Sequence, residues 1–206
     1  MEVHIKSEAL REIIGRKLQK KEVQKIEQEE LGKIKELTLN QKKLSGKKND
    51  IYLQELIFFK GLEQLTICGF EISDFVIDII NQCKTLKKIQ FTKCKWNAQN
   101  RLKDDLEYLV IDSCTDLKEQ ILGNSKCIRI VGNKKLDLAK GKHISKIQKL
   151  YLQNCNIFHF AEIINFKNLY YLNLDGSKIS DKDILEKLAG KIEIHKRKNY
   201  DISEGN

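Results

Sequence analysis

The sequence contains no proline, and only five of its 38 basic residues are arginine. Because proline breaks helix interiors and central strands, its absence favours a succession of uninterrupted elements. Proteins that recognise nucleic acids depend on arginine for bidentate contacts with bases and phosphates. Here the net charge of +9 comes almost wholly from lysine, and lysines alternate with glutamates, as in residues 20–37, which indicates a solvated surface. A lysine-rich binder of nucleic acid or of another acidic surface is the alternative function.

Long apolar runs are also missing. No segment approaches the roughly 18 consecutive apolar residues that a membrane-spanning helix needs, so we expect no membrane span. The first residues, "MEVHIKSEAL", lack the basic region, apolar region and small-residue cleavage site of a signal peptide. We therefore expect a cytoplasmic protein, with a secreted or cell-surface location as the alternative if this chain is a mature or excised form.

Motifs of catalysis and of metal binding are absent from the sequence as well. There is no glycine-rich phosphate loop, no G-x-S-x-G and no H-E-x-x-H, and the four histidines fall in unrelated places. The six cysteines form no C-x-x-C pair, and their spacings match no zinc signature. We expect no enzymatic activity, no cofactor, no metal and no small-molecule substrate, and we expect six free thiols in an intracellular setting.

What the sequence does contain is an internal repeat, visible in residues 147–157, "IQKLYLQNCNI". Its pattern, L-x-x-L-x-L-x-x-N/C-x-L, is the signature of leucine-rich repeats, which have a period of about 20–29 residues. The fourth and sixth positions are apolar in every copy, so chance does not explain the pattern. The eight copies span residues 34–44, 62–72, 86–96, 106–116, 125–135, 147–157, 169–179 and 189–199.

These repeats predict an α/β solenoid, a leucine-rich repeat horseshoe or arc with about eight parallel strands on its concave face. Short helices or irregular segments, such as 74–84 and 181–190, are expected on the convex face. The ninth position of each repeat needs a small side chain that donates to backbone carbonyls after the strand, because an unpaired buried carbonyl is costly. The middle copies place Cys94, Cys114, Asn133, Cys155 and Ser177 there.

The N-terminal part predicts a helical cap, because a solenoid leaves the core of its first repeat exposed unless another element covers it. Residues 7–20 have apolar side chains at helical spacing behind Ser7, a favoured N-cap residue. A second short helix is expected over 27–34. We expect a cap at 1–33, repeats at 34–199 that continue it as one domain, and a polar tail at 200–206.

Residues 9–45 resemble the helical cap that opens many bacterial internalin-like leucine-rich repeat proteins. In that group an amphipathic helix precedes an I-T-x-x-x-L segment and then L-x-x-L-x-L, and Glu27 stands here in place of the usual threonine. The matching positions are Ile26, Leu31, Ile34, Leu37 and Leu39. The resemblance implies an internalin-like fold over nearly the whole chain but no particular ligand. Internalin-like proteins are usually exported, whereas the irregular repeats and ladder cysteines here favour an intracellular relative.

The candidate binding surface lies at the third, fifth and seventh positions, which alternate with the core positions and point out of the concave face. In repeats four to seven these positions concentrate tyrosine, valine and arginine, the composition of an interface centre, so we expect a protein partner there. The candidate partner-binding residues are Tyr108, Val110, Asp112, Arg129, Val131, Tyr151, Tyr171 and Asp175. The alternative is that the tyrosines only pack against each other along the sheet.

Overall fold

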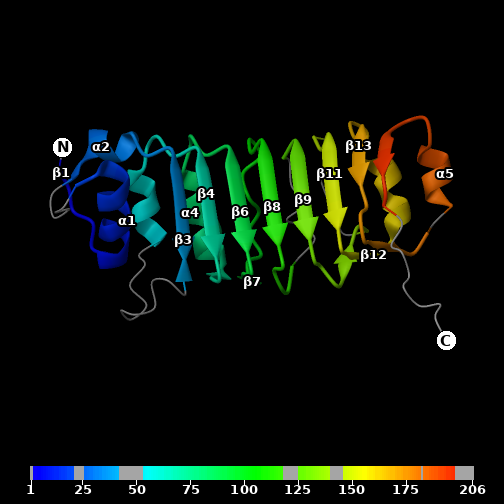
Figure 1. Ribbon diagram of the computed structural model, residues 1–206, viewed down its shortest axis with the longest axis horizontal. Coiled ribbons are helices and arrows are strands. Elements are labelled where there is room, and N and C mark those ends of the chain that lie inside the picture. The colour runs from blue at the N-terminus through cyan, green and yellow to red at the C-terminus, as the bar shows by residue number, and fades with distance from the viewer. Residues whose placement is uncertain are drawn as a thin grey trace.

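A computed structural model of the chain consists of a row of parallel strands with a helical cap at its N-terminal end (Figure 1). It describes residues 2–20, 26–41, 53–117, 125–139, 146–181 and 183–197. The expected tail at 200–206 lies outside the described residues. The eight strands of the main sheet are β3 (Glu36–Asn40), β4 (Gln64–Cys68), β6 (Lys88–Thr92), β8 (Tyr108–Asp112), β9 (Cys127–Val131), β11 (Lys149–Gln153), β13 (Tyr171–Asn173) and β15 (Glu193–His195).

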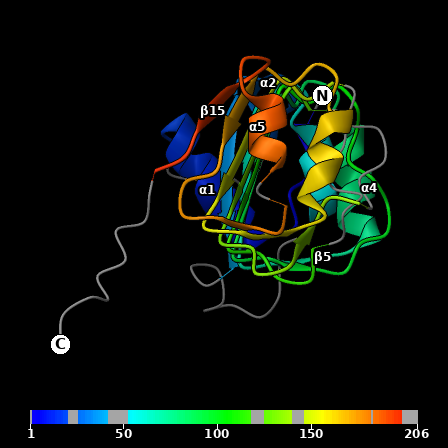
Figure 2. The ribbon, with the colours of Figure 1, turned by 90° about the vertical axis from the view of Figure 1, so that its right-hand side faces the viewer.

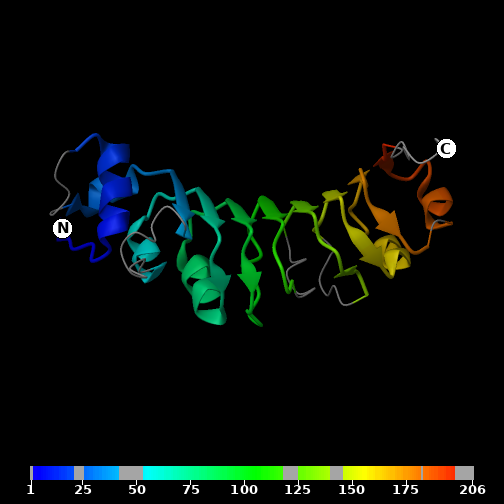
Figure 3. The ribbon, with the colours of Figure 1, turned by 60° about the horizontal axis from the view of Figure 1, so that its bottom comes forward.

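Every neighbouring pair in this sheet is parallel, and the strands follow one another in chain order. Each strand of the first seven repeats begins at the third position of its repeat, where the repeat pattern predicts it. Figure 3 shows the strands on the inner side of a shallow arc, with α4 (Asp74–Gln82) on its outer side. The predicted leucine-rich repeat solenoid is therefore confirmed.

The eighth repeat differs from its expected register by two residues. Tyr171 pairs with Glu193, and Leu172 pairs with Ile194. Ile194 rather than Ile192 therefore occupies the fourth position, and the copy begins at residue 191 instead of 189. The sequence permitted the error because Ile192 and Ile194 are two residues apart and satisfy the period-2 part of the pattern in either register. The hydrogen bond from the Glu193 N–H to the Tyr170 carbonyl, at 2.8 Å, supports the observed register.

A left-handed residue turns the chain sharply after each main-sheet strand from β4 to β13. In six consecutive repeats the eighth position has a positive φ, between 51° and 82°. These residues are Gly69, Lys93, Ser113, Gly132, Asn154 and Gly176. Gly176 has a second reason to be glycine, since a Cβ there would lie 2.1 Å from Asn154 Oδ1. The repeated turn directs the ninth side chain back under the sheet.

The ninth-position side chains form the predicted hydrogen-bond ladder. Four of them donate to the carbonyl of the sixth residue in the preceding repeat, and the pairs are Cys94 with Ile67 (3.4 Å), Cys114 with Phe91 (3.5 Å), Cys155 with Ile130 (3.6 Å) and Ser177 with Leu152 (2.7 Å). Asn133 differs, because its Oδ1 accepts from the Lys135 N–H at 2.9 Å. Four of the five predicted donors therefore satisfy buried carbonyls, which accounts for the cysteines in structural terms.

The convex side combines short helical segments with a second, discontinuous set of strands. Figure 2 shows α4 and the yellow η3 segment on the same side of the main sheet. The helical segments are η1 (Leu53–Phe58), α4, η3 (Phe160–Asn165) and α5 (Ile184–Leu188). The short strands, which follow the turns, are β5 (Glu71–Ile72), β7 (Lys95–Trp96), β10 (Leu136–Asp137), β12 (Asn156–Phe158) and β14 (Lys178–Ile179). These strands were not predicted.

The N-terminal cap contains both expected helices, α1 (Glu8–Leu18) and α2 (Gln28–Gly32). Ser7 caps α1, and its hydroxyl accepts from the Leu10 N–H at 3.1 Å. Strand β1 (Glu2–Val3) pairs antiparallel with β2 (Ile26–Glu27) beside them. Fully buried residues of the cap belong to the same apolar core as the first strand. Among the described residues, every helix is too short or too polar to cross a lipid bilayer.

Candidate functional site: the concave face

The outward positions of the main sheet form a regular grid of partly exposed side chains. In β8 and β11 the second and fourth strand residues are buried, while the first, third and fifth are half-buried. The period-2 geometry of a strand produces this alternation. Because neighbouring strands are in register, the grid has three rows, which correspond to the third, fifth and seventh positions of the repeats.

The predicted partner-binding residues are adjacent in this grid. Val110, Arg129 and Tyr151 are in register across β8, β9 and β11 and form part of the middle row. Tyr108 lies in the third-position row of the same sheet, as does Tyr171. Asp112, Val131 and Asp175 occupy the seventh-position row. The structure thus brings all eight together on one face, which makes a shared binding role geometrically feasible.

Tyr151 and Tyr171 are in direct contact. Their ring centroids lie 5.1 Å apart with the ring planes tilted by 41°, and both side chains are half-buried. Such aromatic pairs contribute about 0.5–1.5 kcal/mol beyond the area they bury. Burial raises the pKa of Tyr151, so its hydroxyl stays protonated and able to donate. The packing expected under the alternative interpretation is present, and both side chains remain partly exposed.

The two candidate aspartates have different surroundings. The Asp175 carboxylate accepts from the Arg197 N–H at 2.7 Å and pairs with His195 Nδ1 at 3.2 Å. These contacts, led by the Arg197 hydrogen bond, lower the pKa of Asp175. Asp112 accepts from the hydroxyl of its neighbour Ser113 at 2.8 Å. Asp175 therefore helps to hold the last strand, whereas Asp112 is more available to a basic group of a partner.

Charge is distributed unevenly across the grid in repeats three to seven. Lys88 and Lys149 lie in the third-position row, whereas Asp112 and Asp175 lie in the seventh-position row. The Lys149 ammonium is engaged with the Tyr170 ring, 5.6 Å from its centroid. In these repeats the N-terminal ends of the strands are therefore positive on the concave side and the C-terminal ends are negative. A partner with complementary charges would bind in one preferred orientation.

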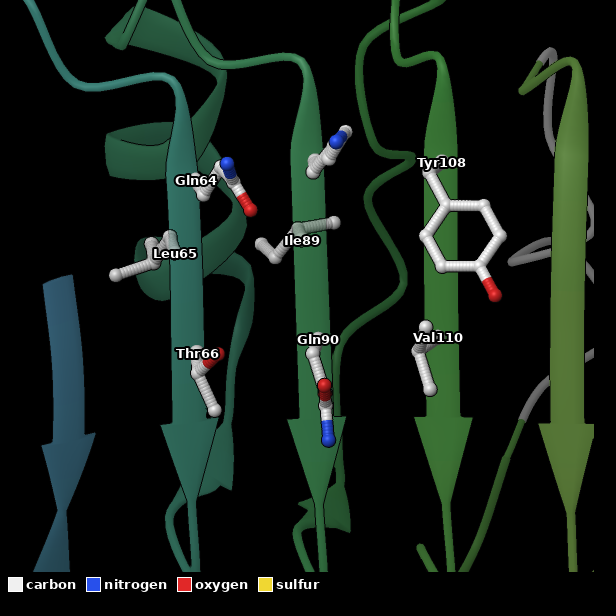
Figure 4. Close-up of a pocket in the computed structure, with 8 residues that line it drawn as sticks. Gln64, Leu65, Thr66, Ile89, Gln90, Tyr108 and Val110 are labelled. Carbon is white, nitrogen blue, oxygen red and sulfur yellow. The ribbon is translucent and has the colours of Figure 1, made fainter. Parts of the chain in front are cut away.

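A hollow interrupts the concave face at β4, β6 and β8, beside the predicted patch. Its volume is about 240 Å³. Figure 4 shows Gln64, Gln90 and Tyr108 on three neighbouring strands around it. The residues that line it are Gln64, Leu65, Thr66, Lys88, Ile89, Gln90, Tyr108 and Val110. The sequence did not predict a site in the part of this hollow that β4 and β6 form. The available signal was that the third and fifth positions of these two repeats are short or polar.

Burial marks four of the cysteines as structural thiols, although a hydrogen bond with Cys114 lowers the pKa of the Cys94 thiol. Cys94, Cys114 and Cys155 are buried in the ladder, and all six cysteines are free thiols in the structure. Burial raises the pKa of Cys155 and of Cys83, and it raises the pKa of Cys127 to about 11. Because the thiolate is the nucleophile, these groups react slowly near neutral pH.

Thiol titration provides a direct check. Unfolding without reductant is expected to expose six thiols, in keeping with six free cysteines. In the native protein at about pH 8 we expect Cys68, which is half-buried, to react first, and Cys127 to follow slowly because its thiolate is scarce. The four buried cysteines should react only on unfolding. Two or more missing thiols would contradict both the free-thiol prediction and its use as support for a cytoplasmic location.

Comparison with known proteins identifies the fold. No protein-family model and no curated protein matches the chain. Among solved structures, internalin C2 of Listeria monocytogenes is similar over 91% of this chain and 91% of its own, with a TM-score of 0.55 and 16% sequence identity. Internalin F of the same species is 17% identical over 93% of this chain and 76% of its own, with a TM-score of 0.36. The similarity to internalin C2 confirms the internalin-like leucine-rich repeat fold.

Proposed function

We propose that this chain is a non-catalytic module that binds a protein partner through its concave face, with its anchors in repeats four to seven. The observation that carries the proposal is the paired rings of Tyr151 and Tyr171, next to an exposed Arg129 on the outward side of the sheet. The core does not require large side chains at these positions, because the fourth and sixth positions already fill it. Aromatic residues and arginine are the residue types that dominate binding energy at interface centres.

The size of the surface supports a macromolecular partner. Strands about 4.8 Å apart place β8 to β13 over roughly 15 Å, and five residues per strand add roughly 16 Å in the other direction. This area is a plausible core for a standard protein interface, whose periphery contributes less energy.

The charge of the concave grid argues against the polyanion alternative on this face. Four basic residues at the outward positions are balanced by four acidic ones, and these are Lys88, Arg129, Lys149 and Arg197 against Glu36, Asp112, Asp175 and Glu193. The excess of lysine therefore lies outside this grid. Nucleic acid bound there would show a steep salt dependence, because each phosphate contact releases a counterion.

Substitution of the tyrosines tests the proposal. A partner is recovered from an extract of the native host, identified and purified, and its affinity is then measured with the parent and with variants at two salt concentrations. Tyr151→Ala and Tyr171→Ala are each expected to weaken binding by about 2 kcal/mol, roughly thirtyfold. The loss in folding stability should stay within about 1.5 kcal/mol, since the ring pair is the main contact removed.

Two controls distinguish an anchor from a general disturbance. Phe75 is an exposed aromatic on α4, 54% accessible, and Phe75→Ala should not change affinity. Lys20 lies in the cap and pairs with Glu30, and Lys20→Ala should be equally neutral; Lys21, beside it, lies outside the described residues. If both tyrosine variants bind like the parent while lysine substitutions abolish binding in a salt-dependent way, the polyanion alternative is correct.

A further inference from the structure

We propose that the hollow between β4 and β8 accepts an acidic side chain of the protein partner, and that Lys88 is the residue that pairs with it. This inference rests on the proposed protein-binding function and adds a specific chemical requirement to it. It extends the binding surface toward the N-terminus, beyond the tyrosine pair.

The first support is the hydrogen bonding around Lys88. Gln64 and Tyr108 flank it in register on the neighbouring strands. The Gln64 amide donates to Glu36 Oε1 at 2.9 Å, and the Gln90 amide donates to Thr92 Oγ1 at 3.0 Å. Both amide nitrogens are thus engaged elsewhere, and within the described residues no hydrogen bond joins either amide oxygen to the Lys88 ammonium.

The second support is that Lys88 carries the single formal charge in the lining of the hollow. Within the described part of the chain it forms no ion pair, whereas the preceding Lys87 pairs with Glu107 at 4.0 Å. The exposed Lys88 ammonium has three N–H donors and no ion-pair partner within the described residues, so it attracts a carboxylate. Of the carboxylates on the same face, Glu36 lies two strands away in the same row and accepts from Gln64, and Asp112 lies at the far end of the neighbouring strand. Neither forms an ion pair with Lys88 within the described residues.

The third support is the size of the hollow. Its volume of about 240 Å³ is below the roughly 300–1,000 Å³ of typical small-molecule pockets. It is also open to the concave face, as Figure 4 shows for the side chains around it. These dimensions suit a single side chain that projects from a bound segment. Apolar neighbours, Tyr108 and Val110, line the side nearest the tyrosine pair and would contact the methylene groups of that side chain.

The geometry fixes the spacing between the acidic residue and the apolar anchor of the partner. Lys88 in β6 and Tyr151 in β11 are separated by three strand intervals and by two residues along the strands, which together give about 16 Å. An extended partner segment would cover that distance in about five residues, at roughly 3.3 Å per residue. A helical segment would need about eleven residues, at 1.5 Å per residue.

Selection from a displayed library of random peptides of about 15 residues tests the proposal even while the natural partner is unidentified. The full chain and its Lys88→Glu variant are used as separate targets. Peptides selected on the parent should carry Asp or Glu at a fixed distance from an aromatic or aliphatic residue, and Lys88→Glu should weaken them about tenfold or more, because attraction becomes repulsion. Selection on Lys88→Glu should instead enrich Lys or Arg at that position.

Lys87→Glu is the matched control, since it makes the same charge change one residue away at a position directed off the grid. It should leave both the selected motif and the affinities unchanged, and circular dichroism should show that both variants are folded. An acidic position that persists on Lys88→Glu, or that is lost equally on Lys87→Glu, overturns the assignment of Lys88. Peptides that keep binding to Lys88→Glu but lose affinity for Tyr151→Ala would refute this inference while leaving the proposed function standing. Peptides indifferent to both would contradict the proposed function as well.

Discussion

Replacement of Phe91 by Ala is expected to lower the free energy of unfolding by about 3–5 kcal/mol, the range for a large buried aromatic. Phe91 is fully buried in β6, at the sixth position of the third repeat. Its ring contacts that of Trp96 edge to face, with centroids 5.2 Å apart and planes at 84°. Phe91 is in register with Ile67 in β4 and with Ile111 in β8. The cavity left by removal of its ring would therefore lie between these two buried side chains. Rigid strands on both sides limit how far the site can collapse.

Urea unfolding followed by circular dichroism measures this loss. Gln90→Ala is the control, since Gln90 precedes Phe91 in the same strand and faces outward, where its amide donates to Thr92. Its cost should stay below about 1 kcal/mol. A solenoid is stabilised by contacts between adjacent repeats, so the cavity should also weaken protection of the neighbouring strands in hydrogen exchange. A loss of unfolding free energy below about 1 kcal/mol for Phe91→Ala would show that the ring contributes little to core packing.

The strands were predictable because two constraints coincide in the middle repeats. Apolar residues at the fourth and sixth positions require a strand with one buried face, and a small donor at the ninth position requires a turn immediately after it. The eighth repeat lacked the second constraint within the described residues, since Arg197 stood at its expected ninth position. The period-2 pattern alone cannot distinguish two registers that differ by two residues, and the observed shift is of that size.

The left-handed turns and the short convex strands could not be predicted with the same certainty. Glycine at the eighth position of three repeats indicates a positive φ, but Lys93 and Ser113 adopt it too, at 51° and 52°, and neither residue type suggests it. These residues are held in this conformation by backbone hydrogen bonds to the next repeat rather than by their own preference. For example, the Lys93 N–H donates to the Asp112 carbonyl of the next repeat at 2.8 Å.

The candidate site was predictable in position and less so in detail. Alternation along the strands identified the outward residues correctly, because side-chain direction in a strand depends on parity alone. It could not indicate that Asp175 is engaged by the backbone of Arg197 or that Gln64 and Gln90 hydrogen-bond away from Lys88. Those contacts depend on rotamers, which a repeat pattern does not specify.

Glu55→Ala is expected to destabilise the protein by about 2–4 kcal/mol and to loosen the N-terminal cap. Glu55 lies in η1 and is 3% exposed. Its two carboxylate oxygens accept from the Lys6 N–H at 2.6 Å and the Ser7 N–H at 3.3 Å. Ser7 is itself fully buried and caps α1. Removing the carboxylate leaves two backbone donors without a partner at the start of the cap, and each such buried group costs about 1–3 kcal/mol.

The location of the effect distinguishes this link from an ordinary core contact. Glu55 connects segments 48 and 49 residues apart in the chain, so its loss should reduce hydrogen-exchange protection in α1 more than in β9 or β11. Glu55→Gln retains one carbonyl oxygen and should lie between the parent and Glu55→Ala. Glu29→Ala is the control, because Glu29 is exposed and pairs with Lys33 at 3.7 Å on the surface, where an ion pair contributes about 0.3–0.5 kcal/mol. Equal losses for Glu55→Ala and Glu29→Ala would contradict the link. Protection lost first in the cap, in contrast, would identify Glu55 as the residue that fastens the cap to the first repeats, because it is the carboxylate that satisfies the backbone donors at the start of α1.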